Sequence, residues 1–261
     1  MLVLILCAFF GAAGWAIGGY RTASLFVFCV LLAATAVYAY ADRALLGMLG
    51  AREFALAEDP RLRSTVDTLS AKLGILPPKL YLIIDGFPRA FVAGRGPRAS
   101  AVAVSTGLLA ALPPAELEGV LAHELAHVRS RDVLVQSFAT MLAVVLIELS
   151  RLGGFLEKAL LAVLGPMAAA FIHLLLSPKR ELAADRIAAE TCGSPHGLAD
   201  ALLRLDQASE LVSFAANPAT EPLYTTNPFA VEGLAALFVT HPPVAERVTL
   251  LRGSDSASFV A

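Results

Sequence analysis

Residues 122–128 read Ala-His-Glu-Leu-Ala-His-Val, and this stretch determines both the helix and the chemistry expected of the chain. Positions i and i+4 of a helix share a face, so His123 and His127 can direct their imidazoles towards one metal ion. Glu124, one residue further round, can then reach a water molecule at the metal. The pattern is typical of a hydrolytic zinc site, where a tetrahedral ion keeps one position for water and needs a third protein ligand.

The flanking residues favour a packed ligand helix over a surface helix with two unrelated histidines. Pro113 and Pro114 come before the motif with acidic residues in the next turn, and Arg129 and Arg131 follow it, which is a common order at helix ends. Apolar residues at helical spacing supply a face beside the histidines: Leu117, Val120, Leu121, Leu125 and Val128. We therefore expect a buried helix that begins near residue 114.

The composition indicates a membrane protein. Hydrophobic residues make up 57% of the 261 residues and charged residues 16%, and the mean hydropathy is +0.70, unusually apolar for a soluble domain. Four stretches account for this: 1–20, 22–41, 133–149 and 159–177. Each is near the length that crosses about 30 Å of hydrocarbon. The first is a poor signal peptide, because it lacks a basic start and leads directly into the second.

The last two stretches admit two interpretations, because they contain Gln136, Pro166 and His173. They form either two full crossings or a helical hairpin partly buried in protein. Basic residues gather after the second stretch, before the third and after the fourth. By the positive-inside rule, both termini and the motif helix lie in the cytoplasm, with the protein spanning a plasma (inner) membrane.

These observations predict four parts and two kinds of partner. The parts are 1–41 with two transmembrane helices, 42–132 with an edge strand and the motif helix, a hydrophobic hairpin at 133–177, and a cytoplasmic part at 178–261 with the third ligand. The lipid bilayer is one partner. A net charge of −2 and no basic cluster with aromatics give no indication of nucleic acid.

The third ligand should be an acidic residue or histidine on the cytoplasmic side. Residues 177–190 read Ser-Pro-Lys-Arg-Glu-Leu-Ala-Ala-Asp-Arg-Ile-Ala-Ala-Glu, a helix with serine at its cap and proline at its first position. Glu181 and Asp185 share a face. One carboxylate could bind zinc while the other accepts the outer ring N–H of a ligand histidine. Spacing alone does not distinguish this from a solvated helix.

The segments 121–132 and 177–190, separated by a hydrophobic hairpin and preceded by two hydrophobic stretches, resemble the M48 family of membrane zinc endopeptidases, the HtpX-like branch in particular. Further similarity lies in segments 87–94, 101–109 and 240–247. The resemblance implies one Zn2+ ion per chain with His123, His127 and Glu181 as ligands. It also implies Glu124 as general base and Asp185 as the partner of a ligand histidine.

One position departs from the family's pattern. The family usually has asparagine where this chain has Arg89, so a substrate or transition-state contact there would come from a different side chain. The fold implied is an integral membrane α+β protein, a mostly helical zincin-like metallopeptidase domain with a small β-sheet and about four transmembrane or membrane-buried helices.

In the mechanism expected of this site, Glu124 takes a proton from water and passes it to the leaving amine. His241 is a candidate donor to the oxyanion, and equally a structural histidine before two prolines. A polypeptide could add to an edge strand, for which the candidates are Ala101, Val102, Ala103 and Val104. A loop at 215–229 could cover the site.

The function expected is proteolytic quality control by a zinc-dependent endopeptidase that cleaves polypeptides, misfolded membrane proteins in particular. One alternative is a catalytically inactive membrane scaffold or chaperone-like binding protein that retains a structural zinc. The intact Glu124 argues against it, because a scaffold needs no general base. Another is a hydrolase of a small amide or lipid. The sequence leaves the natural substrates, the oligomeric state and the regulation open.

Overall fold

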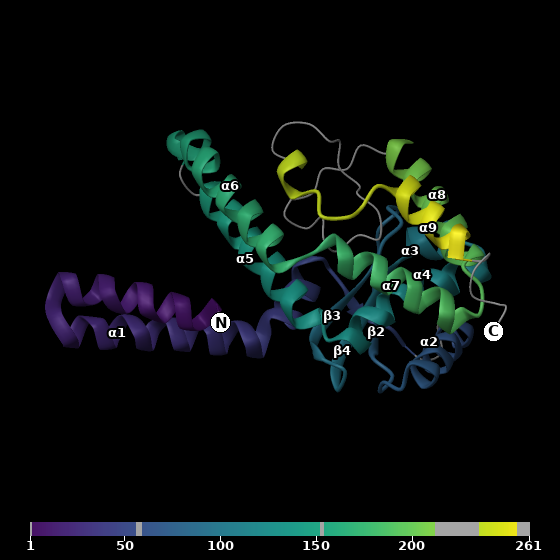
Figure 1. The fold of residues 1–261 in the computed structure, drawn as a ribbon, viewed down its shortest axis with the longest axis horizontal. Coiled ribbons are helices and arrows are strands. Elements are labelled where there is room, and N and C mark those ends of the chain that lie inside the picture. Colours follow the sequence, from purple (N-terminus) through teal and green to yellow (C-terminus); the bar gives the residue numbers. More distant parts are fainter. Residues whose placement is uncertain (1, 56–58, 152–153, 212–234, 255–261) are drawn as a thin grey trace. The chain divides into compact units, whose positions relative to one another are not determined.

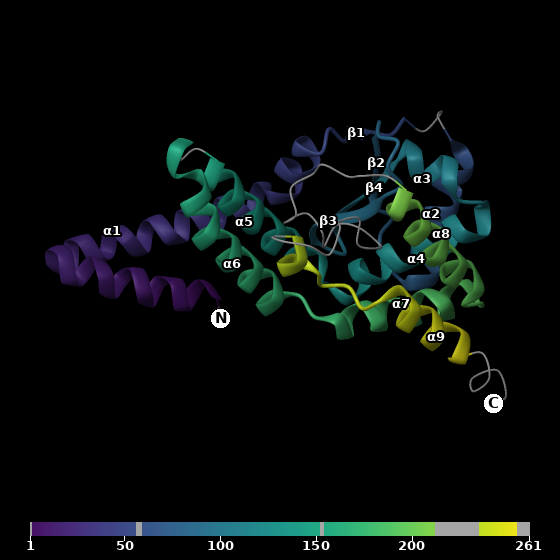
Figure 2. The ribbon, with the colours of Figure 1, turned by 90° about the horizontal axis from the view of Figure 1, so that it is seen from above.

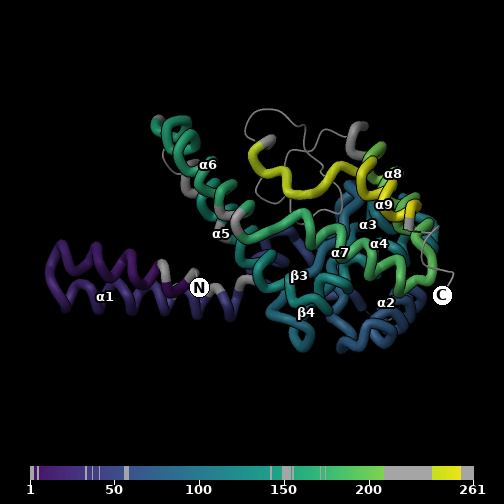
Figure 3. The backbone as a smooth tube through the Cα atoms, viewed as in Figure 1, coloured from purple at the N-terminus to yellow at the C-terminus, as the bar shows by residue number. Residues whose placement is uncertain are grey.

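A computed structural model of the chain describes residues 2–55, 59–151, 154–211 and 235–254. The chain divides into two compact units, Met1–Ala44 and Leu45–Ala261. The backbone trace in Figure 3 marks the remaining residues in grey.

The first unit consists of most of helix α1 (Leu2–Met48). Its backbone breaks at Gly18 and Gly19, where Gly19 has φ 69° and ψ −157°, so α1 folds back as two antiparallel arms (Figures 1 and 2). The arms approach closely, because a Cβ atom on Gly14 would lie 2.8 Å from Cα of Ala23. The break lies near the boundary between the two hydrophobic stretches at 1–20 and 22–41.

The apolar part of α1 is long enough to cross a membrane. Residues Leu6–Tyr40 have a mean hydropathy of 2.1, and none of this surface is buried inside the protein. Soluble proteins rarely leave such a large apolar surface uncovered. Within the described ranges this is the one clear candidate, and a second arises only if α4 (Pro114–Ser130) and α5 (Val133–Arg151) form one span bent by 96°.

The second unit contains a four-stranded sheet with the order β1-β2-β4-β3. The strands are β1 (Arg52–Glu53), β2 (Lys79–Ile83), β3 (Ala90–Gly96) and β4 (Ala99–Ser105). Strand β4 pairs in parallel with β2, placing Leu80 opposite Val102, and antiparallel with β3, placing Phe91 opposite Ala103.

The prediction of an edge strand at residues 101–104 is therefore wrong. These residues belong to the interior strand β4: Ala101, Val102, Ala103 and Val104. A tight turn after Gly96 brings β4 back along β3, while β2, earlier in the chain, occupies the other side of β4. Both rows of backbone groups on β4 are thus used within the sheet. Residues Ala90 to Ala93 of the edge strand β3 are fully buried as well.

Helix α4 lies at the centre of this unit, and its bounds agree with the proline and arginine signals in the sequence. It contacts the sheet through β3 and β4, and it contacts helices α2 (Pro60–Leu73), α7 (Pro178–Cys192) and α8 (His196–Leu211). Every residue from Gly119 to Val128 is buried. Because α4 is covered on several sides, it forms the core of the unit and cannot face lipid as part of a bent span.

Two shorter helices complete the packing. Helix α3 (Thr106–Ala111) follows β4 directly, and helix α9 (Val244–Ser254) packs against α7 and α8. Strand and helix residues together form the main apolar core around Val66, Leu121 and Leu202.

Helices α5 and α6 (Glu157–Leu175) form the expected hairpin, with the short helix η1 (Gly154–Leu156) at its tip (Figure 1). Ile147 of α5 and Ile172 of α6 belong to a separate apolar cluster, which also holds Phe238 of the short helix η3 (Ala235–Phe238). His173 packs here rather than binding metal, with Nε2 at 2.9 Å from the Leu237 carbonyl oxygen. The loop expected at 215–229 lies outside the described residues.

Candidate metal centre

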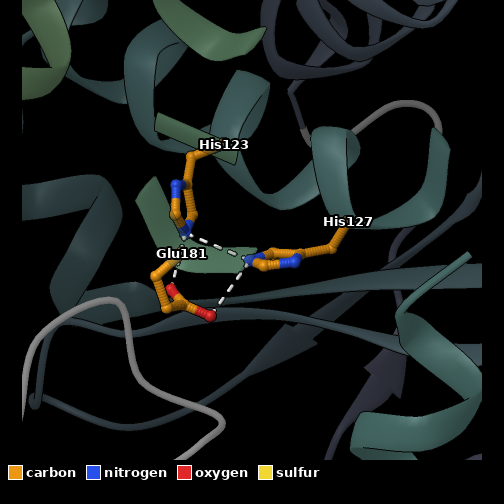
Figure 4. A group of neighbouring side chains, drawn as sticks. All are labelled: His123, His127 and Glu181. Carbon is orange, nitrogen blue, oxygen red and sulfur yellow. Dashed lines mark hydrogen bonds and ion pairs between the residues drawn. The ribbon is translucent and has the colours of Figure 1, made fainter. Parts of the chain in front are cut away.

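The two helices carrying the predicted ligands cross so that three side chains converge. His123 and His127 extend from one face of α4, and Glu181 lies in the first turn of α7 (Figure 4). The two Nε2 atoms of the histidines are 3.3 Å apart. Glu181 places Oε2 at 3.4 Å from Nε2 of His123 and Oε1 at 3.5 Å from Nε2 of His127. The expected third ligand is thus beside the two histidines.

These separations fit a zinc ion. A tetrahedral zinc with ligands at about 2.0–2.1 Å holds neighbouring ligand atoms about 3.3–3.4 Å apart. The two histidine nitrogens, 3.3 Å apart, fit this spacing, and each lies 3.4–3.5 Å from one of the two carboxylate oxygens of Glu181. The histidine rings stand almost perpendicular, at 86°, which lets both nitrogens face one point. Two imidazoles and one carboxylate are also a usual ligand set for a catalytic zinc.

Asp185 holds the outer nitrogen of His123. Its Oδ1 lies 2.8 Å from Nδ1 of His123, and Arg247 of α9 donates to both of its carboxylate oxygens. Burial alone would raise the pKa of Asp185, but the Arg247 guanidinium and His123 lower it to about 2. An ionised Asp185 accepts a hydrogen bond from the Nδ1–H group of His123 and leaves Nε2 of this histidine free to bind metal.

A second carboxylate lies beside His127. Asp132 follows α4 and places Oδ2 at 3.7 Å from Nδ1 of His127, while its Oδ1 is 3.0 Å from Nη1 of Arg180. Burial by itself would lower the pKa of His127, but the carboxylates of Glu181 and Asp132 raise it to about 10. The carboxylates around His127 therefore stabilise a positive charge at this position.

The charges around the ligands also favour a divalent cation. In the part of the chain that the structure describes, four carboxylates gather here with two guanidinium groups: Glu124, Asp132, Glu181 and Asp185 with Arg180 and Arg247. With both imidazoles neutral, as metal binding requires, the carboxylates exceed the guanidinium groups by two charges. Buried carboxylates are stable as anions only when paired or bound to metal, so a 2+ ion fits the balance.

Glu124 is buried beside the three ligands, with 4% of its surface exposed. Burial raises the pKa of its carboxyl group above the ordinary value, and His123 and His127 oppose this in part. A carboxylate with a raised pKa is a better proton acceptor near neutral pH.

A pocket opens beside the ligands, on the side of His127 and Glu181. It is lined by His127, Asp132, Gln136, Leu176, Ser177, Arg180, Glu181, Thr240 and His241. Nε2 of His241 lies 3.3 Å from Oε2 of Glu181, so the chain lies at the site again at residue 241. The structure thereby favours a position for His241 within the site over a remote structural role.

Arg89 lies in the loop directly before β3. Its Nη2 donates to Oδ2 of Asp85 at 2.6 Å, and its backbone N–H donates to Oγ of Ser105 at 3.0 Å.

The structure brings five predicted residues together with His123: Glu124, His127, Glu181, Asp185 and His241. The strand residues 101–104 stay in the sheet interior.

Sequence reasoning missed the contributions of Asp132, Arg180 and Arg247. Asp132 reaches His127 because the chain reverses at Arg131, whose left-handed conformation its residue type does not suggest. The role of Arg247 depends on how α9 packs against α7, which no local pattern reveals.

A buried His-Glu-x-x-His helix with a carboxylate ligand from a second helix defines a metallopeptidase-like centre. In agreement, the model of Peptidase family M48 matches residues 56–255. A Protease HtpX homolog of Pelotomaculum thermopropionicum is 39% identical over 96% of both chains. One of Acidiphilium cryptum is 40% identical over 97% of this chain and 94% of the relative. The chain therefore belongs to peptidase family M48, which confirms the resemblance seen in the sequence.

A solved structure shares the fold. The crystal structure of S. mikatae Ste24p aligns with a TM-score of 0.52 at 19% identity, covering 94% of this chain and 61% of that one. At this identity the likeness concerns the fold alone.

Proposed function

We propose that the chain is a zinc-dependent endopeptidase that cleaves polypeptides at the cytoplasmic surface of a membrane. The observation that carries this proposal is the convergence of His123, His127 and Glu181, each of which offers a ligand atom within 4.8 Å of the others, with Glu124 buried beside them. Membership of family M48 supports peptide hydrolysis.

His123, His127 and Glu181 would hold the zinc. When bound, zinc supplies a positive charge that polarises the scissile carbonyl and acidifies water. Glu124 accepts the proton of the attacking water and delivers it to the leaving amine. Its raised pKa suits both steps, because the group must first gain a proton and then lose it. Asp185 keeps the His123 ring oriented throughout.

His241 is suited to stabilise the oxyanion that develops on the scissile carbonyl. Its imidazole lines the pocket and lies within 3.3 Å of Glu181, so a carbonyl placed at the ligands would be within its reach. A hydrogen bond aimed at the developing charge lowers the barrier without reorganisation during the reaction.

The membrane location is supported by α1, whose apolar surface needs a lipid environment. We further propose that α5 and α6 also enter the bilayer, which would give about four membrane helices, since Val145, Val163 and Met167 are exposed along them. Ser130 and Ser177 flank this hairpin, so it would leave and return on the cytoplasmic side beside the pocket. Misfolded membrane proteins would then be the substrates within reach.

Casein cleavage by the purified full-length protein tests this function. Wild type should cleave casein, lose activity with chelator and regain it with zinc. Glu124→Gln should retain stoichiometric zinc yet lose nearly all turnover, because an amide cannot accept the proton. Glu181→Ala should lose the zinc itself. As a control, Glu190→Ala changes an exposed carboxylate on the same helix and should behave as wild type.

Two results would refute the proposal. Full zinc content in Glu181→Ala would remove that residue from the site. Undiminished cleavage by Glu124→Gln would remove the general base. If wild type holds zinc but cleaves neither casein nor other unfolded chains, the scaffold alternative applies instead.

A further inference from the structure

The outer nitrogens of the two ligand histidines have different surroundings. Nδ1 of His123 lies 2.8 Å from Oδ1 of Asp185, within hydrogen-bond distance. Nδ1 of His127 is buried and makes no hydrogen bond in the part of the chain that the structure describes. An imidazole that binds metal through Nε2 carries its proton on Nδ1, and that buried N–H needs an acceptor.

The carboxylate of Asp132 lies close to Nδ1 of His127. Oδ2 of Asp132 is 3.7 Å from Nδ1 of His127, so a shift of about 0.8 Å would bring it to the usual hydrogen-bond length of about 2.9 Å. Side-chain rotation alone can supply a movement of this size.

The backbone places Asp132 there. Helix α4 ends at Arg131, which has left-handed φ 62° and ψ 24°, and the N–H of Arg131 donates to the Val128 carbonyl. The N–H of Asp132 donates to the His127 carbonyl at 3.1 Å. This helix-ending turn reverses the chain and returns Asp132 over the last turn of α4. The proximity of Asp132 to His127 is therefore built into the fold.

Arg180 fixes the other oxygen of this carboxylate. Its Nη1 lies 3.0 Å from Oδ1 of Asp132, which leaves Oδ2 on the side of His127. Arg180 is adjacent to the proposed ligand Glu181 on α7. Helix α7 therefore supplies one proposed ligand and also the cation that pairs with Asp132 beside His127. The arrangement repeats the buried series Arg247, Asp185 and His123.

From this geometry we infer that Asp132 is the positioning residue of His127, accepting its Nδ1–H when zinc is bound, with Arg180 holding Asp132 in place. The inference rests on the proposed zinc function and adds a residue to it. Unlike Asp185 and Arg247, the pair lines the pocket, and the Arg180 side chain is 41% exposed. The His127 side of the centre is therefore the one that a substrate can touch.

Zinc affinity of the purified full-length protein, measured by competition with a chromogenic chelator, tests this role. Asp132→Ala should weaken zinc binding about 10- to 100-fold. Asp132→Asn should recover part of the loss, because its amide oxygen can accept the N–H. Arg180→Ala should have a smaller effect, and the double variant should match Asp132→Ala, since Arg180 acts through Asp132. Asp200→Ala, which breaks an exposed pair with Arg252, is the control.

Thermal unfolding of the zinc-free variants separates positioning from folding. Asp132→Ala and Asp200→Ala should unfold at similar temperatures without zinc. Wild-type zinc affinity in Asp132→Ala would overturn the inference while leaving the proposed function intact. A loss of affinity matched by an equal loss of zinc-free stability would also overturn it. If wild type binds no zinc, both proposals fail.

Discussion

Arg247 donates two hydrogen bonds to the carboxylate of Asp185, from Nε to Oδ2 at 2.8 Å and from Nη2 to Oδ1 at 2.6 Å. Both side chains are buried, and Oδ1 of Asp185 also faces Nδ1 of His123 at 2.8 Å. The planar guanidinium fixes the plane of the carboxylate, and the carboxylate fixes the imidazole. Helix α9 thus orients His123, a proposed metal ligand, although it contributes no proposed ligand itself.

Replacing Arg247 should destabilise the protein strongly. Arg247→Met keeps much of the volume but leaves Asp185 buried without its cation, which typically costs about 3–5 kcal/mol. Thermal unfolding in detergent measures the loss. Arg252→Met on the same helix is the control, because its pair with Asp200 is exposed and should be worth about 1 kcal/mol or less. Equal losses in the two variants would contradict the structural role of Arg247.

Removing the metal should lower the unfolding temperature. Without zinc, four carboxylates remain beside two guanidinium groups, as described for the metal centre. Zinc that binds only the folded chain adds about 2.7 kcal/mol when its concentration is 100 times the dissociation constant. Thermal scans with chelator and with added zinc measure the shift. Glu124→Gln should retain the shift and Glu181→Ala should lose most of it; a full shift in Glu181→Ala would contradict the ligand assignment.

The end of α4 carries backbone strain that a glycine would relieve. Arg131 has φ 62°, a left-handed conformation that costs a residue with a Cβ atom roughly 1 kcal/mol or more. We expect Arg131→Gly to raise the free energy of unfolding by up to about 1 kcal/mol, and Arg131→Val to lower it. Denaturation in detergent compares the two. Arg129→Gly, inside the helix, should instead cost about 1 kcal/mol, and a gain there would argue against this explanation.

Helical spacing made much of the centre predictable. Two histidines four residues apart share a face in any α-helix, and so do Glu181 and Asp185. The bounds of α4 and α7 followed from Pro114 and Pro178 at their first positions. In these elements a local pattern determines the direction of a side chain, so the sequence alone was sufficient.

The sheet and the surroundings of the ligands depend on contacts between distant segments. Strand β4 has the alternation expected of an edge, but its pairing with β2 involves residues more than 20 positions earlier, such as Leu80 with Val102. Asp132 reaches His127 only because Arg131 adopts a conformation usual for glycine, which its residue type does not suggest. Arg247 reaches Asp185 across 62 residues. Pairings of this kind appear only once the chain is folded.

The last prediction concerns the hairpin of α5 and α6. Single cysteines can be placed in a chain whose native Cys7, Cys29 and Cys192 have been replaced, and labelled with a membrane-impermeant maleimide. Ser130→Cys, at the exposed end of α4, should be labelled only from the cytoplasm. Leu156→Cys tests the tip, where the side chain is 48% exposed and the backbone lacks the positive φ of the neighbouring Gly154.

Helices α5 and α6 have 19 residues each, so each helix is about 28 Å long, close to the thickness of the hydrocarbon. A hairpin that crosses the bilayer therefore places the cysteine of Leu156→Cys on the outside. Labelling at this position from outside would support the proposal of about four membrane helices. Absence of labelling from either face, with full labelling after solubilisation in detergent, would show that the hairpin ends within the bilayer. Labelling of Ser130→Cys from outside would reverse the orientation and place the metal centre on the opposite side of the membrane.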